Sequence, residues 1–273
     1  MPNHVKNRLI IDDEETQIKE IMERIKFDEH GVGSIDFEKI IPMPPELKVE
    51  SGSRSKQALE LYSLYIEQRY GESPGFFGAF MRKHQVDRQF MDFGKQLYEN
   101  KQKYGAADWY DWSISNWGTK WNSYGYAEGF QYDGSNEIIF ETAWSRPEPI
   151  VKALSKMFPD IEFRHQWADE DIGCNVGEIL YHGGEEIEWD IPTAFSKEAY
   201  EMASDILGTP LTEWGLYYDK KTGSYECRED EPVEASPPKP SLRDTLRQNA
   251  EQSKAELGDS VPALTKDKGE PSL

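Results

Sequence analysis

The stretch DWYDWSISNWGTKWNSY, residues 108–124, contains four tryptophans within thirteen positions, at 109, 112, 117 and 121. Spacings of three and four residues place each pair on one face of a helix. We expect a helix end at residues 113–116, with Gly118 in a left-handed turn. Because tryptophan is usually buried, this stretch is expected to join a helical region to the sheet, with Trp112 and Trp121 largely buried.

The same stretch also has a functional interpretation. If one or two rings are exposed beside Lys120, they would suit a base, a sugar or the side chain of a partner. Polar neighbours of the rings, among them Asp108 and Asp111, are expected to accept bonds from buried indole N–H groups. The candidate binding residues are Trp109, Trp112, Asn116, Trp117, Thr119, Lys120 and Trp121.

The first forty residues predict a strand, a helix and a strand. Residues 5–11 are rich in β-formers, and residues 14–25 carry apolar side chains at helical spacing. Residues 35–41 are expected to form the second strand, stopped by Pro42. Two further helices are predicted over residues 55–70 and 81–104.

The second half predicts the same order of elements again. A strand over 137–144 leads to a helix opened by a capping box of Ser145 and Glu148. Strict alternation over 161–167 predicts a half-buried strand that includes His165 as a core residue. A hairpin at 176–181 and 186–189 and a short helix at 196–207 follow.

Two such β-α-β units predict an α+β fold with a ferredoxin-like split β-α-β sheet. The expected ferredoxin-like domain spans residues 1–190, with a helical, Trp-rich insertion at about 55–125 between the two units. Residues 191–229 are expected to form an extension that packs on this domain. Residues 230–273 have no aromatics and are rich in Pro, Ser and charge, which predicts a disordered tail.

Several blocks of this sequence resemble the YubB ferredoxin-like family, whose members are encoded by plasmids, integrative elements, phages and their bacterial hosts. The resemblance runs from the N-terminus to about Trp189 and implies a ferredoxin-like fold in a mobile-element context. It implies no reaction, because no catalytic residues carry over from the family. The blocks that carry it are MPNHVKNRL (1–9), FEKIIPMPPEL (37–47), DWYDWSISNWGTKWN (108–122), FETAWSRPEPIVKALSKMFPDIEF (140–163) and residues 173–180.

The chain is strongly acidic, with 51 Asp and Glu against 31 Lys and Arg, a net charge of −20. Such a charge repels the phosphates of duplex DNA and anionic lipid, so we expect binding to neither. Residues 160–190 hold ten acids and one base, Arg164. This run predicts either a solvated sheet face or an acidic face that docks on a basic partner.

Two cysteines, Cys174 and Cys227, fit a reducing compartment and do not supply the four ligands of an iron–sulfur cluster. The N-terminus lacks the apolar core of a signal peptide, so a cytoplasmic location is expected. His165, Cys174 and His182, beside the acids at 169–171, lack zinc-ligand spacing. We therefore expect no metal and no cofactor.

No nucleophile elbow, phosphate-binding loop or metalloprotease motif occurs in the sequence. The leading hypothesis is therefore a non-enzymatic interaction protein of a mobile element or its bacterial host. It would bind a host or defence protein through its acidic surface or a Trp-edged cleft. The alternatives are a nucleic-acid-associated accessory factor that uses the sheet face, and a small-molecule-binding protein or unrecognised enzyme.

The composition of the tail generates a first prediction. Residues after Asp230 lack the apolar side chains needed to offset chain entropy, so limited proteolysis is expected to cut there first. A chain truncated at Asp230 should keep the melting temperature of the full chain. A loss of several degrees on truncation, measured by calorimetry, would contradict this.

Overall fold

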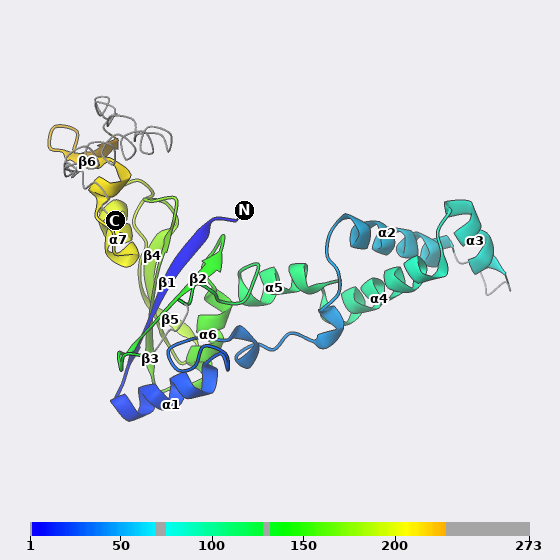
Figure 1. Cartoon of the computed structure of the whole chain (residues 1–273), viewed down its shortest axis with the longest axis horizontal. Helices are drawn as coiled ribbons and strands as arrows, with labels where there is room; N and C mark the ends of the chain where they lie inside the picture. Colours follow the sequence, from blue (N-terminus) through cyan, green and yellow to red (C-terminus); the bar gives the residue numbers. More distant parts are fainter. Residues whose placement is uncertain (1, 69–74, 128–131, 228–273) are drawn as a thin grey trace, which may run out of the picture. The chain divides into compact units, whose positions relative to one another are not determined.

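The computed structural model describes residues 2–68, 75–127 and 132–227. Its centre is a five-stranded antiparallel sheet in the order β2-β1-β3-β4-β5 (Figure 1). The strands are β1 (His4–Asp12), β2 (Glu137–Ala143), β3 (Glu162–Asp169), β4 (Val176–His182) and β5 (Glu185–Asp190). The α-helices are α1 (Glu15–Ile25), α2 (Ser53–Gln68), α3 (Phe76–His84), α4 (Arg88–Tyr104), α5 (Trp109–Trp117), α6 (Glu148–Met157) and α7 (Lys197–Leu207).

Two β-α-β units were expected, but the described residues form one split β-α-β unit, which consists of β2, α6 and β3. Strand β1 lies between β2 and β3 and is antiparallel to both, so β2 and β3 are parallel to each other. The expected strands at 5–11, 137–144 and 161–167, the hairpin at 176–189 and the helix at 14–25 are all confirmed within one to three residues. The fold is therefore α+β, as the sequence predicts.

The strand predicted over residues 35–41 is wrong. Phe37–Lys39 form a short 3₁₀ helix, η1, in which Asp36 accepts a bond from the backbone N–H of Glu38 at 3.0 Å. The N–H groups of Ile35 and Phe37 donate to Tyr126 Oη and Asn122 Oδ1. Side chains thus satisfy this backbone, so the apolar residues are buried without a strand partner.

The main core lies between the sheet and helices α1 and α6. It holds the apolar stripe of α1, Ile150, Val151 and Leu154 of α6, and inward side chains of the strands. Helix α7 packs on the opposite face, where Ala199, Ala203 and Ile206 contact Ala168 and Val176. Helices thus pack on both faces of the sheet, but α7 leaves Ile139 of β2 49% exposed.

Helices α2 and α4 pack against each other around a separate small core that contains Ala58, Leu97 and Ala107. They approach closely at Gly94, where a Cβ atom would lie 2.3 Å from the carbonyl oxygen of Ala58. The single helix predicted over 81–104 is wrong, because Gln85 has a left-handed backbone and Asp87 caps a new helix.

Helix α5 holds the tryptophan-rich stretch and runs unbroken to Trp117. The helix end expected at residues 113–116 is therefore wrong, whereas the left-handed turn at Gly118 is confirmed with φ 78°. The buried hydroxyl of Ser113 donates to the carbonyl of Tyr110 in the helix and to that of Lys120 after it. This serine therefore has hydrogen-bond partners without ending the helix.

The capping box predicted at the start of α6 is also wrong. Pro147 occupies the N-cap position, and Ser145 Oγ instead donates to the carbonyl of Gly118 at 2.6 Å. Glu148 pairs with Arg146 at 2.8 Å. By contrast, α7 begins and ends as expected, with Ser196 accepting from the N–H of Ala199 and Gly208 in a left-handed C-cap.

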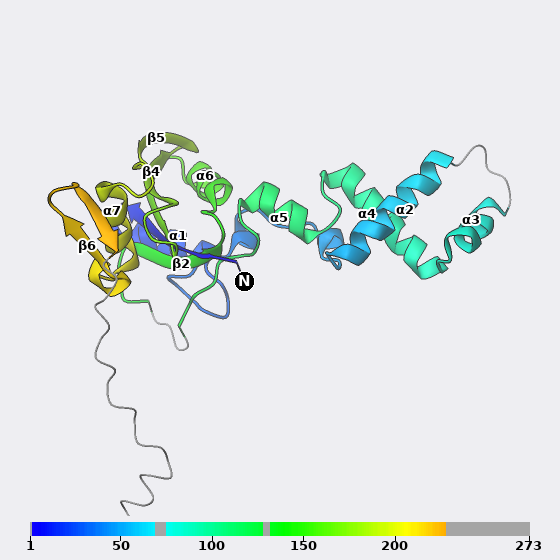
Figure 2. The ribbon, with the colours of Figure 1, turned by 90° about the horizontal axis from the view of Figure 1, so that it is seen from above.

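A small hairpin of β6 (Leu216–Asp219) and β7 (Ser224–Cys227) follows α7 and was missed by the sequence analysis (Figure 2). Two further 3₁₀ helices are η2 (Pro45–Leu47) and η3 (Leu211–Trp214). The predicted tail lies outside the described residues. No helix in the described part of the chain is long and apolar enough to cross a membrane.

His165 is a core residue, as predicted, and is fully buried in β3. Its Nε2 atom lies 3.0 Å from Asn7 Oδ1, which can only accept, so Nε2 carries the proton. Burial, and secondarily the charge of Arg146, lowers the pKa of His165 to about 3. The imidazole is therefore neutral in the folded chain.

This buried histidine predicts a pH dependence of stability. In the unfolded chain the pKa is about 6.5, so only the unfolded state gains a proton as the pH falls below that value. The free energy of unfolding should fall by roughly 1.4 kcal/mol per pH unit between about pH 6.5 and about pH 3. Urea unfolding of the wild type and of His165→Gln measures this contribution as the difference in slope. Identical slopes would contradict the prediction.

Candidate binding site

The structure divides the predicted binding residues into a buried set and a surface set. Trp112 and Trp117 are 6% and 4% exposed, and Trp109 packs against the same core. The indole N–H of Trp117 donates to the carbonyl of Ile41 at 2.8 Å. The acidic and amide side chains nearby do not accept this bond, contrary to expectation, because a backbone carbonyl lies closer.

Thr119 and Asn116 also have structural partners. The hydroxyl of Thr119 is buried, donates to the carbonyl of Ala143 at 2.8 Å and accepts from the same residue's N–H. Asn116 Nδ2 donates to the carbonyl of Trp112. The stretch therefore ties α5 to the end of β2, as its expected joining role requires.

Trp121 and Trp144 are exposed, and the half-buried side chains of Lys120 and Tyr110 lie beside them. Lys120 Nζ is 4.4 Å from the ring centroid of Trp121, 5.0 Å from that of Trp144 and 5.9 Å from that of Tyr110. These distances allow cation–π attraction to each ring. We call these four residues the Lys120 aromatic cluster.

The burial expected for Trp121 is wrong, since 38% of this residue is exposed. The left-handed turn at Gly118 ends the helix, so the spacing of four residues from Trp117 no longer places both rings on one face. Trp144 is 44% exposed and was missed as a site residue. The sequence places it as the last residue of the predicted strand, whereas β2 ends one residue earlier at Ala143.

Trp144 has a left-handed backbone with φ 70°, a sparsely populated conformation for a bulky residue. Its N–H donates to the carbonyl of Asn3 at 2.9 Å, and its carbonyl accepts from Asn175 Nδ2 at 3.3 Å. Two distant parts of the chain thus hold the backbone of this exposed residue in place. Such held outliers concentrate at functional sites.

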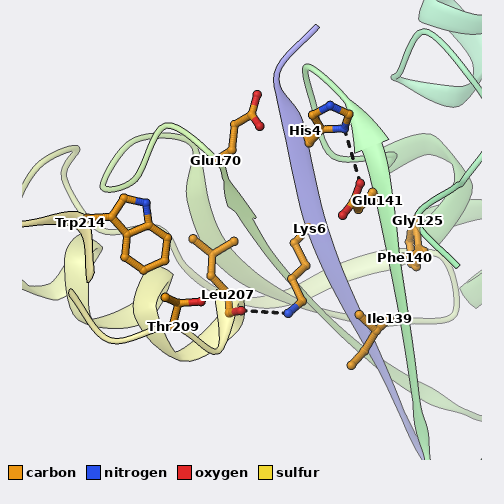
Figure 3. Close-up of a pocket in the computed structure, with 10 residues that line it drawn as sticks. All are labelled: His4, Lys6, Gly125, Ile139, Phe140, Glu141, Glu170, Leu207, Thr209 and Trp214. Atoms are coloured by element: carbon orange, nitrogen blue, oxygen red, sulfur yellow. Dashed lines mark hydrogen bonds and ion pairs between the residues drawn. The ribbon is translucent and has the colours of Figure 1, made fainter. Parts of the chain in front are cut away.

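A hollow of about 620 Å³ lies beside this cluster, between β1 and β2 on one side and the end of α7 on the other (Figure 3). The two surfaces are neighbours, since the rings of Trp121 and Tyr124 are 6.2 Å apart and Tyr124 bonds to His4. The residues that line the hollow are His4, Lys6, Gly125, Ile139, Phe140, Glu141, Glu170, Leu207, Thr209 and Trp214.

His4 is the centre of the polar contacts in the hollow. Its Nδ1 atom lies 2.9 Å from Tyr124 Oη and 3.4 Å from Glu141 Oε2, so one nitrogen faces both a phenol and a carboxylate. Burial, with the charges of Glu141 and Glu170, raises the pKa of Tyr124 to about 12. Tyr124 is therefore a neutral phenol near pH 7.

Gly125 and Lys6 fix the walls of the hollow. A Cβ atom at Gly125 would lie 2.8 Å from Glu141 Cγ, and φ is +87°, so only glycine fits there without moving that carboxylate. Lys6 Nζ donates to the carbonyl of Leu207 at 3.0 Å, a favourable place for a cation at the end of α7 (Figure 3). The hollow thus offers acidic, basic and aromatic groups to a ligand.

The residues weighed as metal ligands do not come together. His165 is in the core, whereas His182 is exposed at the end of β4. The thiol of Cys174 donates to the carbonyl of Asp171, and burial and the Asp171 carboxylate raise its pKa. Among the described residues, no group of three His, Cys, Asp or Glu side chains is placed to hold a metal ion.

The contrast between buried and exposed tryptophans predicts that their replacement by alanine lowers the free energy of unfolding by different amounts. Trp112→Ala should lower the free energy of unfolding by about 3–5 kcal/mol, because it leaves a large cavity. Trp121→Ala should cost less than about 1 kcal/mol, because the ring is surface-exposed and contributes mainly cation–π contact. Chemical denaturation measures both. Equal losses in the two variants would contradict this division of the stretch.

Comparisons with known proteins bear on the fold. A search of curated proteins gave no match. The crystal structure of a protein Api92 from Yersinia pseudotuberculosis is similar at 13% identity and a TM-score of 0.34, over 71% of this chain and 99% of that one. Residues 116–210 match the family described as "Ferredoxin-like domain in Api92-like protein". This part of the chain is thus similar to the ferredoxin-like domain of Api92-like proteins, and its fold is ferredoxin-like.

Proposed function

We propose that this chain is a non-enzymatic interaction protein that binds a partner protein through the Lys120 aromatic cluster and the adjoining hollow. The observation that carries the proposal is the exposure of Trp121 and Trp144, at 38% and 44%, around a single lysine. Tryptophan and tyrosine supply most of the strong contacts at protein interfaces.

The cluster is also arranged before any partner arrives. Bonds from Asn3 and Asn175 fix the backbone of Trp144, and Lys120 lies between the rings. A preorganised surface loses less conformational entropy on binding, so more of its contact energy appears as affinity. The two rings are therefore better suited to binding than two freely rotating side chains.

The convergence of His4, Lys6, Glu141 and Glu170 supports a second candidate, a small polar molecule bound in the hollow. Such a ligand would meet donors, acceptors and both charges within one recess. Lys6 already bonds to the end of α7, and His4 to Tyr124, so these groups have partners in the chain. This favours binding rather than catalysis.

Use of the sheet face by a nucleic acid has less support. Helix α7 packs on that face, and two arginines of the strands are paired with carboxylates there. Arg8 lies 2.6 Å from Asp205, and Arg164 lies 2.5 Å from Glu178. These pairs leave fewer free cations for phosphate contacts.

The proposal also includes the genetic context of the chain, the kind of partner that it binds and its location in the cell. The blocks that resemble the YubB family support a mobile-element or bacterial-host context, in which the partner would be a host or defence protein. The net charge of −20 supports a basic partner surface. A cytoplasmic location fits the two cysteines, both of which are free thiols.

Affinity capture with full-length bait tests this function. Wild-type chain, a Trp121→Ala/Trp144→Ala variant and a Tyr218→Ala control are exposed to an extract of the native host, and captured proteins are identified by mass spectrometry. Tyr218 is a matched control because it is 41% exposed and lies on β6. We expect a protein retained by the wild type and the control and lost from the double variant.

The result is conclusive only if the double variant melts like the wild type, which its surface location predicts. Retention of every captured protein by the double variant would contradict the proposal. A Glu141→Gln variant separates the contribution of the hollow from that of the rings, because it changes the hollow and leaves the aromatic rings in place. Loss of capture in Glu141→Gln alone would assign binding to the hollow.

A further inference from the structure

Strand β5 forms one end of the sheet, and no other strand of the described residues pairs with its outer side. The opposite edge is different. There β2 exchanges two backbone bonds with Tyr124, at 3.0 and 2.8 Å from Glu141. An unpaired edge presents a row of N–H and C=O groups to any extended chain.

Three apolar side chains at or next to this edge are exposed to an unusual degree. Trp189 is 69% exposed, Ile187 is 45% exposed, and Ile191, just after the strand, is 51% exposed. Trp189 pairs with Ile179, so its side chain points to the sheet face that carries α6. A run of exposed apolar residues on one strand indicates an interaction surface rather than chance.

The same strand is strongly acidic. Its sequence is EEIEWD, and Glu185, Glu188 and Asp190 are all exposed. Glu186 has its own partner, Lys152 of α6, at 2.7 Å. The free carboxylates thus alternate along the edge with the apolar side chains.

We propose that the outer edge of β5 accepts an extended, basic segment of a partner protein as a sixth strand. Backbone groups of the segment would bond to the free edge of β5, its apolar side chains would cover Trp189 and Ile187, and its lysines or arginines would face Glu188 and Asp190. Strand addition of this kind takes affinity from the backbone and specificity from alternate side chains.

Charge decides between the possible occupants. In a second copy of this chain paired along the same edge, the carboxylates of the two strands would face one another, and like charges on paired strands are destabilising. A basic segment meets the opposite charge at the same positions. This surface shares no residue with the Lys120 aromatic cluster, so its partner segment need not belong to the protein bound there.

A labelled peptide tests the proposal with the full-length chain. The probe is an end-blocked peptide of about seven residues, the length of an ordinary strand, that alternates lysine and valine. Its binding is followed by fluorescence anisotropy, and amide hydrogen exchange reports which backbone groups become protected. We expect binding to the wild type and new protection at residues 185–190.

Two variants of the edge, Trp189→Ser and Glu188→Lys/Asp190→Lys, should each weaken binding of this peptide by roughly tenfold or more. Glu20→Lys/Glu29→Lys is the matched control. It changes the net charge equally at exposed positions elsewhere, so it should bind like the wild type. Trp121→Ala/Trp144→Ala should also bind normally, which separates this proposal from the proposed function.

Three results would overturn the inference. The first is no binding to the wild type, or protection outside residues 185–190. The second is an equal loss of peptide affinity in Glu188→Lys/Asp190→Lys and in the charge control Glu20→Lys/Glu29→Lys, which would attribute the effect to net charge alone. The third is a concentration-dependent dimer of the wild type that Trp189→Ser abolishes, which would assign the edge to a second copy.

Discussion

The buried amide of Asn7 joins the three strands on which the rest of the structure depends. Its nitrogen donates to the carbonyl of Val5 and to the hydroxyl of Thr142 on β2, and its oxygen accepts from His165 on β3. Strands more than a hundred residues apart in sequence thus meet at one fully satisfied polar group. Because an unpaired amide is costly in a core, this arrangement favours one register of β1 between its neighbours. Helices α1 and α6 then have a single apolar face to cover.

Much of this sheet could be predicted from the sequence, because alternation and helical spacing act locally. The stripe of α1 and the alternation of β3 were sufficient for their assignment. The error at residues 35–41 arose where distant groups replaced a strand partner. Asn122 and Tyr126 satisfy the backbone at Ile35 and Phe37, and local pattern gives no sign of them.

The candidate site was predictable in part, for the same reason. The tryptophan-rich stretch was visible as a composition, and the alternative of an exposed ring beside Lys120 describes Trp121, whose expected burial was wrong. Its division into core and surface depends on the turn at Gly118, which rotates Trp121 out of the helical face. The hollow could not be predicted, because His4, Glu141 and Glu170 meet only once β1 lies beside β2 and the chain leaves β3.

The separate core of α2 and α4 has a consequence for how this chain tolerates change. Ala58, Leu97 and Ala107 form a cluster distinct from that beneath the sheet, and Asn100 links α4 to the carbonyls of Glu46 and Ala107, where the chain enters and leaves the helical pair. The apolar contacts that order this pair are thus largely its own, and elements with few contacts to a central sheet open more readily than the sheet itself. A change in the length or the surface of this pair would therefore leave the packing of the residues that hold the sheet in place.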